Sequence, residues 1–147
     1  MSAANRKRGQ RAEVAVVNHL RANGYPDARR YLSGDGRQPG DIDWHPLICL
    51  EVKDVASSAW PTWCRQAAAE APAGTVPVVV RRERGVTDVG QWPCRVMGGP
   101  WYAATELHAF DSLSLTAAEV DGFYWATLPF ARLVAAVAAL DAPGAVA

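Results

Sequence analysis

The chain has 147 residues, half of them apolar, and its 15 lysine and arginine residues balance 15 aspartate and glutamate residues. A chain of this length buries enough surface to fold as one globular domain without a disulfide framework or a structural metal. It contains no run of about 18 apolar residues and no apolar segment behind its basic N-terminus, so we expect neither a membrane span nor a secretory signal. We therefore expect a cytoplasmic protein.

The first half of the chain predicts one helix followed by three strands. Apolar residues at helical spacing indicate a helix over about 7–22. A short strand is expected around 29–32, followed by a flexible loop over 33–40. Residues 41–44 and 47–53 are then predicted to pair as a β-hairpin that turns at a His-Pro dipeptide.

A second helix and two more strands are expected next. Ser57 or Ser58 can cap a helix that runs to about Ala71, with a proline in its first turn, where a missing N–H is harmless. The β-branched run over 76–82 predicts a buried strand, and 91–97 predicts another.

The tail gives weaker signals. Residues 98–115 have no clear period and are expected to be irregular. Thr116 and Glu119 form a capping-box pattern, which predicts the start of a helix. Pro129 is expected to open a final alanine-rich helix to about Leu140. The order of elements predicts an α/β or α+β domain.

Positive charge is concentrated in the N-terminal quarter. Residues 1–37 carry eight basic residues against three acidic ones, whereas 85–147 carry two against six. This asymmetry is typical of a face that binds a polyanion, and a solvated basic helix explains it equally well. The three cysteines are far apart, so we expect reduced, buried thiols.

Asp41 and Glu51 are expected to face each other across the hairpin, because each lies five residues from Pro46 and cross-strand partners are about 5 Å apart. Alternation along the strand places Lys53 on the same face as Glu51. Two facing carboxylates repel unless a cation lies between them, and hard ions such as Mg²⁺ or Mn²⁺ prefer oxygen ligands. Lys53 can then orient or deprotonate an attacking water, or stabilise charge at phosphorus. The alternative is a surface Glu-Lys pair on a half-exposed strand.

Glu13 is a carboxylate on the apolar stripe of the first helix. It shares that stripe with Val16, Val17 and Leu20, so it is aimed at the core side. Burying it alone is costly, so it needs a metal-bound water, a lysine or a hydrogen-bond donor nearby. The alternative is a frayed helix that leaves Glu13 in solvent.

The spacing Asp41-x9-Glu51-x-Lys53, behind a helix that bears Glu13, resembles the PD-(D/E)XK nuclease superfamily. It is most similar to the small Holliday junction resolvase-like and phage-encoded endonucleases, although glycine stands before the aspartate where the family name has proline. The resemblance covers about residues 5–85. It implies a restriction-endonuclease-like αβββαβ core with a mixed central sheet flanked by helices.

The family also implies an activity and a domain plan. We expect a single nuclease domain over 1–147, with its core at about 5–97 and a C-terminal helical extension over about 98–147. The implied activity is Mg²⁺-dependent hydrolysis of phosphodiester bonds in DNA, selective for DNA structure, in phage or bacterial recombination or repair. Mn²⁺ would substitute for Mg²⁺.

The family assigns roles to residues of this chain. Asp41 and Glu51 would be the metal ligands and Lys53 the catalytic lysine. Glu13 and Gln66 would be further site residues. Asp43 shares a face with Asp41 and would be the ligand if the register shifted.

DNA is the expected partner. Basic side chains around the first helix and before Asp41 can reach phosphates beside a scissile bond. The expected DNA contacts are Arg6, Lys7, Arg8, Arg11, Arg29, Arg30, Ser33 and Arg37. A homodimer follows from the same likeness, because a four-way junction offers two symmetric strands. The alternatives are a nicking, flap or single-strand-directed repair nuclease of this fold, and a non-catalytic nucleic-acid-binding module.

Overall fold

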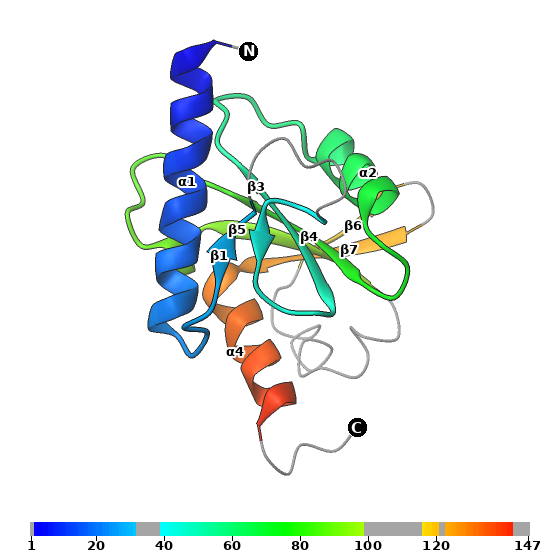
Figure 1. Ribbon diagram of the computed structural model, residues 1–147. Coiled ribbons are helices and arrows are strands. Elements are labelled where there is room, and N and C mark those ends of the chain that lie inside the picture. Colours follow the sequence, from blue (N-terminus) through cyan, green and yellow to red (C-terminus); the bar gives the residue numbers. More distant parts are fainter. Residues whose placement is uncertain (1, 32–38, 99–115, 121–122, 143–147) are drawn as a thin grey trace.

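The computed structural model describes residues 2–31, 39–98, 116–120 and 123–142, with only the backbone for 116–120 and 123–124 (Figure 1). Most of the loop predicted over 33–40, and nearly all of the irregular segment predicted over 98–115, lie outside these ranges. None of the described helices is long and apolar enough to cross a membrane.

The first six main elements follow the predicted order αβββαβ. They are α1 (Ala3–Ala22), β1 (Arg29–Arg30), β2 (Ile42–Asp43), β3 (Ile48–Lys53), α2 (Trp60–Glu70) and β4 (Val76–Arg81). The first helix begins earlier than predicted because the Ser2 hydroxyl accepts a hydrogen bond from the Asn5 N–H at 3.2 Å. The predicted cap of the second helix is wrong, since α2 starts after Ala59 and has no side-chain cap.

The tail contains two strands that were not predicted. After η1 (Val89–Gln91) come β5 (Pro93–Met97), β6 (Thr116–Val120), β7 (Phe123–Pro129) and α4 (Phe130–Asp141). The helix predicted to start at Thr116 is wrong, because this residue opens a strand that pairs antiparallel with β7. Since β7 also pairs with β5, long-range pairing overrides the local capping pattern. The final helix begins after Pro129, as predicted. Because β6 and β7 precede this helix, the predicted helical extension over 98–147 is only partly helical.

The strands form one mixed sheet in the order β1-β2-β3-β4-β5-β7-β6. Only β3 and β4 are parallel, and α2 connects them. The other neighbours are antiparallel. A mixed sheet flanked by helices confirms the coarse α/β (α+β) class.

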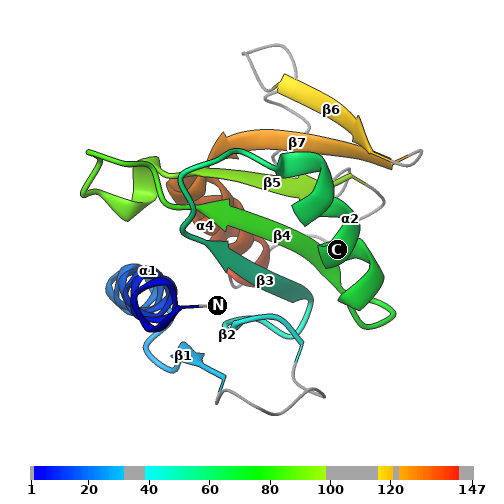
Figure 2. The same cartoon turned by 90° about the horizontal axis from the view of Figure 1, so that it is seen from above.

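Helices cover both faces of the sheet. Figure 2 shows α1 and α4 on one face and α2 on the other. On the α1/α4 face, Ile48, Leu50 and Val52 of β3 belong to a large core that includes Val16 and Phe130. On the α2 face the buried cluster is smaller and consists of Trp63, Cys64, Ala67, Val79 and Trp125. The three cysteines are free and buried, as predicted.

Candidate active site

The hairpin has the register predicted from its sequence. Ile42 is the partner of Leu50, as a turn centred on Pro46 requires. The Asp41 N–H donates to the Leu50 carbonyl at 2.8 Å, and its Oδ2 accepts from the Val52 N–H at 2.8 Å. One oxygen of the Asp41 carboxylate is therefore fixed by the neighbouring strand.

Gly40 makes the close approach of Asp41 to β3 possible. Its φ of +75° lies in the left-handed region that side chains disfavour. A Cβ at this position would lie 2.6 Å from the Leu50 carbonyl oxygen. Only glycine therefore fits before Asp41 without moving the backbone that places its carboxylate.

The two carboxylates act on each other directly. Burial, the charge of Asp41 and a hydrogen bond with Asp41 together raise the pKa of Glu51 to about 8. Lys53 lowers this pKa, whereas Glu70 on α2 raises it further. Glu51 therefore holds its proton more tightly than an ordinary carboxyl group does, and a bound cation would relieve the same repulsion.

The alternation predicted along β3 is confirmed by its neighbours. Glu51 is the parallel partner of Val79, which belongs to the buried cluster on the α2 face. Burial and the charges of Glu51, Glu70 and Asp41 raise the pKa of the Cys49 thiol to about 11. The carboxylates and Lys53 therefore belong to the α2 face, while Leu50 faces the larger core.

Glu13 lies near Asp41, although it comes from α1. Its Oε1 is 3.5 Å from Nε of Arg30, in a largely buried ion pair. Burial and the charge of Asp41 raise the pKa of Glu13, and Arg30 opposes both effects. The partner that this carboxylate was predicted to need is thus an arginine.

Two other predicted positions are not in contact with the pair. Asp43 forms an ion pair with Arg29 at 3.0 Å, so the register favours Asp41 and not Asp43 as the partner of Glu51. Gln66 is exposed on α2, one turn before Glu70. Sequence reasoning missed Glu70, because its approach to β3 depends on how α2 packs on the sheet.

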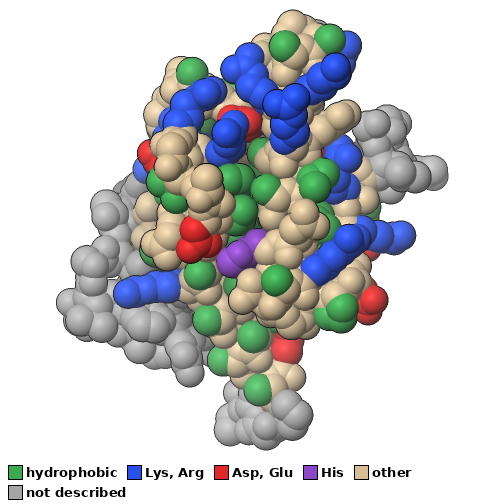
Figure 3. Space-filling view, turned by 90° about the vertical axis from the view of Figure 1, so that its left-hand side faces the viewer, with side chains coloured by type: hydrophobic (Ala, Val, Ile, Leu, Met, Phe, Trp, Pro, Cys, Tyr) green, Lys and Arg blue, Asp and Glu red, His purple; other side chains and the backbone are tan. Residues whose placement is uncertain are grey.

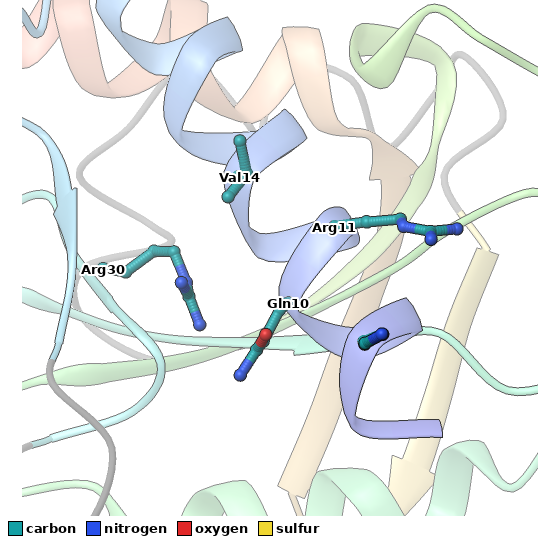
Figure 4. Close-up of a pocket in the computed structure, with 5 residues that line it drawn as sticks. Gln10, Arg11, Val14 and Arg30 are labelled. Atoms are coloured by element: carbon teal, nitrogen blue, oxygen red, sulfur yellow. The ribbon is translucent and has the colours of Figure 1, made fainter. Parts of the chain in front are cut away.

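Four of the predicted DNA contacts, Arg6, Lys7, Arg8 and Arg11, belong to the N-terminal half of α1, where Figure 3 shows a group of Lys and Arg side chains. A surface hollow of about 350 Å³ lies between this helix and β1, and it is lined by Lys7, Gln10, Arg11, Val14 and Arg30. In Figure 4 the Arg30 side chain extends from β1 toward Gln10, while Arg11 points away from it.

The remaining predicted DNA contacts do not line this hollow. The Arg8 guanidinium donates to the Asn5 side chain at 2.6 Å, and Arg6 lies exposed on the same helix. Arg29 is occupied by Asp43. Ser33 and Arg37 lie outside the described residues.

The donor set of the site is a pair of carboxylates. Among the described residues, no three His, Cys, Asp or Glu side chains gather as a metal cage. Asp41 and Glu51 nevertheless suit Mg²⁺, which is usually held by one or two carboxylates with water and substrate phosphate completing its shell. No protein-family model, curated protein or solved structure matches the chain. We therefore infer the function from the geometry of the site.

Proposed function

We propose that the protein is a Mg²⁺-dependent DNA endonuclease with Asp41 and Glu51 as its metal ligands. The observation that carries the proposal is the hydrogen-bonded approach of these two carboxylates in a half-buried setting, with Lys53 on the same face of the strand. A simple surface Glu-Lys pair would not need a second carboxylate beside Glu51. Two carboxylates held against their own repulsion are the usual sign of a functional cation or proton site.

The chain's own residues would divide the work as follows. Bound Mg²⁺ would supply polarisation of the phosphodiester and neutralisation of its charge. The Val52 N–H holds one oxygen of Asp41 and so would orient this carboxylate for a ligand. Lys53 would hold the attacking water or stabilise the charge that develops at phosphorus. Glu13, held by Arg30, adds a carboxylate that can orient water beside Asp41.

The basic hollow provides a place for the DNA backbone. Arg30 lines the hollow and also pairs with Glu13, so the hollow adjoins Glu13, on which the charge of Asp41 acts. Lys7 and Arg11 can neutralise phosphates there without reading sequence. Binding of this kind weakens steeply as salt rises.

The finer parts of the proposal rest on the family resemblance alone. They are a restriction-endonuclease-like core, selectivity for branched DNA and a homodimer. The proposed cytoplasmic location rests instead on the sequence, which has no long apolar run. Within the same fold, a nicking, flap or single-strand nuclease is the nearest alternative. A non-catalytic nucleic-acid-binding module is less well supported, because a pair of carboxylates repels phosphate.

A cleavage panel tests the proposal. The substrates are a four-way junction, a flap, a linear duplex and a single strand, each incubated with Mg²⁺ and with EDTA. We expect metal-dependent cuts inside the strands, placed symmetrically on the junction, and no cuts by Glu51→Gln. If the folded wild-type protein binds these DNAs but cuts none of them with Mg²⁺ or Mn²⁺, the binding-module interpretation replaces the nuclease.

A further inference from the structure

A group of basic side chains continues from the carboxylate pair across the α2 face of the sheet. Lys53 on β3 is the parallel partner of Arg81 on β4. Arg95 on β5 is the antiparallel partner of Val79, which belongs to the buried cluster on this face. Because alternate residues share a face, Lys53, Arg81 and Arg95 all lie on the side that α2 covers. We call these three residues the basic row.

The position of Arg95 is fixed by residues of α2. Its guanidinium carbon lies 4.9 Å from the centre of the Trp60 ring, at the first residue of the helix. A hydrogen bond from Arg95 and its charge also act on the Cys64 thiol, lowering a pKa that burial raises. The head group is therefore held in place by contacts that do not neutralise its charge.

Donor groups of the row are buried without acceptors. The Nε atoms of Arg81 and Arg95 are inaccessible to solvent and have no hydrogen-bond partner among the described residues. Asp54, the buried acid that follows Lys53 in the chain, forms ion pairs with Arg82 at 3.1 Å and with Arg84 at 4.0 Å. A phosphate from outside cannot reach these Nε atoms, so it would be bound by the other guanidinium nitrogens of these two partly exposed side chains.

Phosphate fits this arrangement better than a carboxylate of the protein does. A guanidinium binds phosphate through parallel hydrogen bonds. Because Arg95 is opposite Val79, Arg81 and Arg95 are diagonal neighbours about 7–8 Å apart, within reach of one another for long side chains. The acids already placed on this face are Asp41, Glu51 and Glu70, and the cation that acts on Glu51 is Lys53. Among the described residues no ion pair joins Arg81 or Arg95 to an acid, which favours an anion from outside.

We propose that the basic row binds backbone phosphates of nucleic acid on the α2 face, an inference that rests on the proposed endonuclease function. In the order of the sheet, Arg30 of the hollow lies on β1, the carboxylates lie at β2 and β3, and the arginines of the row lie on β4 and β5. Arg30 lies on the α1 side of the sheet and the row on the α2 side, so the two groups of basic residues lie on opposite faces. On the α2 face the row extends from the carboxylates toward β5, where it would hold the DNA strand on one side of the bond to be cut.

Binding of labelled four-way junction DNA, followed by fluorescence anisotropy in EDTA over a range of salt, tests the row without cleavage. The variants are Arg81→Gln, Arg95→Gln and the charge-preserving Arg95→Lys. Removing one phosphate contact should weaken binding about fivefold near 0.15 M salt and make the slope of log K against log salt shallower by about 0.9. Arg95→Lys should keep most of the slope. Arg132→Gln on α4, across the sheet, is the matched control and should bind as the wild type does.

The binding and cleavage results distinguish failure of the basic-row proposal from failure of the endonuclease proposal. If Arg81→Gln and Arg95→Gln fold and bind with the affinity and salt slope of the wild type, while Arg11→Gln binds more weakly and the wild type cuts DNA, the row is refuted and the endonuclease stands. If the folded wild type neither binds nor cuts DNA, both proposals fail. Unfolding midpoints of all variants show whether a loss of binding reflects a loss of fold.

Discussion

The two faces of the central sheet differ in the side chains that they carry. The α1/α4 face buries aliphatic and aromatic side chains from α1, β3, β4 and α4 in one continuous core. The α2 face has a smaller buried cluster, and beside it lie the carboxylate pair and the basic row. One face therefore provides most of the stability, and this leaves the other free to hold charged groups together at an energetic cost.

The largest expected contrast comes from two adjacent residues of β3. Leu50 is fully buried on the α1/α4 face, so Leu50→Ala should lower the free energy of unfolding by about 2–5 kcal/mol. Glu51→Gln should leave stability unchanged or raise it at pH 8, because it removes a charge repelled by Asp41. Urea denaturation measures both changes.

Activity should show the reverse order for the same two variants. Glu51→Gln should reduce Mg²⁺-dependent cleavage by more than about 100-fold, since even outer-shell partners of a metal are worth about 10–100-fold. Leu50→Ala should retain cleavage at temperatures where it remains folded. Loss of cleavage in both variants, with Glu51→Gln also destabilised, would show that the two faces are not separable.

Gly40→Ala should affect both faces, with a smaller loss of stability. The substitution puts a Cβ against the Leu50 carbonyl at a left-handed φ, which costs roughly 1–3 kcal/mol. Because Asp41 is the next residue, its carboxylate should shift and cleavage should fall even in the folded protein. Gly85→Ala is the control, since its φ is +81° but no atom lies within 4 Å of its Cβ. Equal cleavage by both variants would contradict the role given to Gly40.

The pH dependence of stability without metal should report on the α2 face. The folded-state pKa of Glu51 is about 8, above its ordinary value of 4.5, so the folded state holds this proton more tightly than the unfolded state. The free energy of unfolding should therefore fall as pH rises from about 5 through about 8. Glu51→Gln should remove this part of the fall. Thermal unfolding in EDTA over this pH range measures the effect. If the unfolding midpoints of the two proteins fall equally with pH, the raised pKa of Glu51 is refuted.

The smallest effect is expected at the polar edge of the α1/α4 face. Asp141, at the end of α4, accepts hydrogen bonds from the Tyr25 hydroxyl at 2.9 Å and from His45 Nε2 at 3.0 Å. Because the Leu47 N–H donates to Nδ1 of His45, the neutral ring carries its proton on Nε2 and donates it to Asp141.

Asp141→Ala should cost about 1 kcal/mol of unfolding free energy, and Asp141→Asn less. These hydrogen bonds lower the pKa of Asp141 although partial burial opposes them. Their contribution is therefore present above the ordinary pKa of aspartate, near 4, and lost as pH falls below it. Acid unfolding followed by circular dichroism measures this loss. An unchanged acid midpoint in Asp141→Ala would contradict it.

Local sequence signals predicted the hairpin register. That register followed from the position of Pro46, and in the structure Asp41 and Glu51 of the two strands interact. The arrangement of the sheet could not be predicted in this way. Arg81 and Arg95 are far from Lys53 in sequence. The strand order β3-β4-β5 places Arg81 beside Lys53 and Arg95 on the next strand.

The error in the tail has the same cause. The segment that begins at Thr116 carries a helix-capping pattern but forms a strand, because β7 offers it a partner in the sheet. A capping box describes only a few residues, while strand pairing depends on segments that the local pattern does not include. Pro129, by contrast, marks the start of α4 correctly, since its effect on the backbone is local.

The most direct test of the central claim is the binding of Mn²⁺ followed by titration calorimetry at pH 8. We predict binding by the wild type, loss of binding in Asp41→Asn and Glu51→Gln, and retained binding in Asp43→Asn, whose carboxylate is paired with Arg29. Binding that survives in Glu51→Gln, or that disappears in Asp43→Asn alone, would contradict the assignment of Asp41 and Glu51 as the metal ligands.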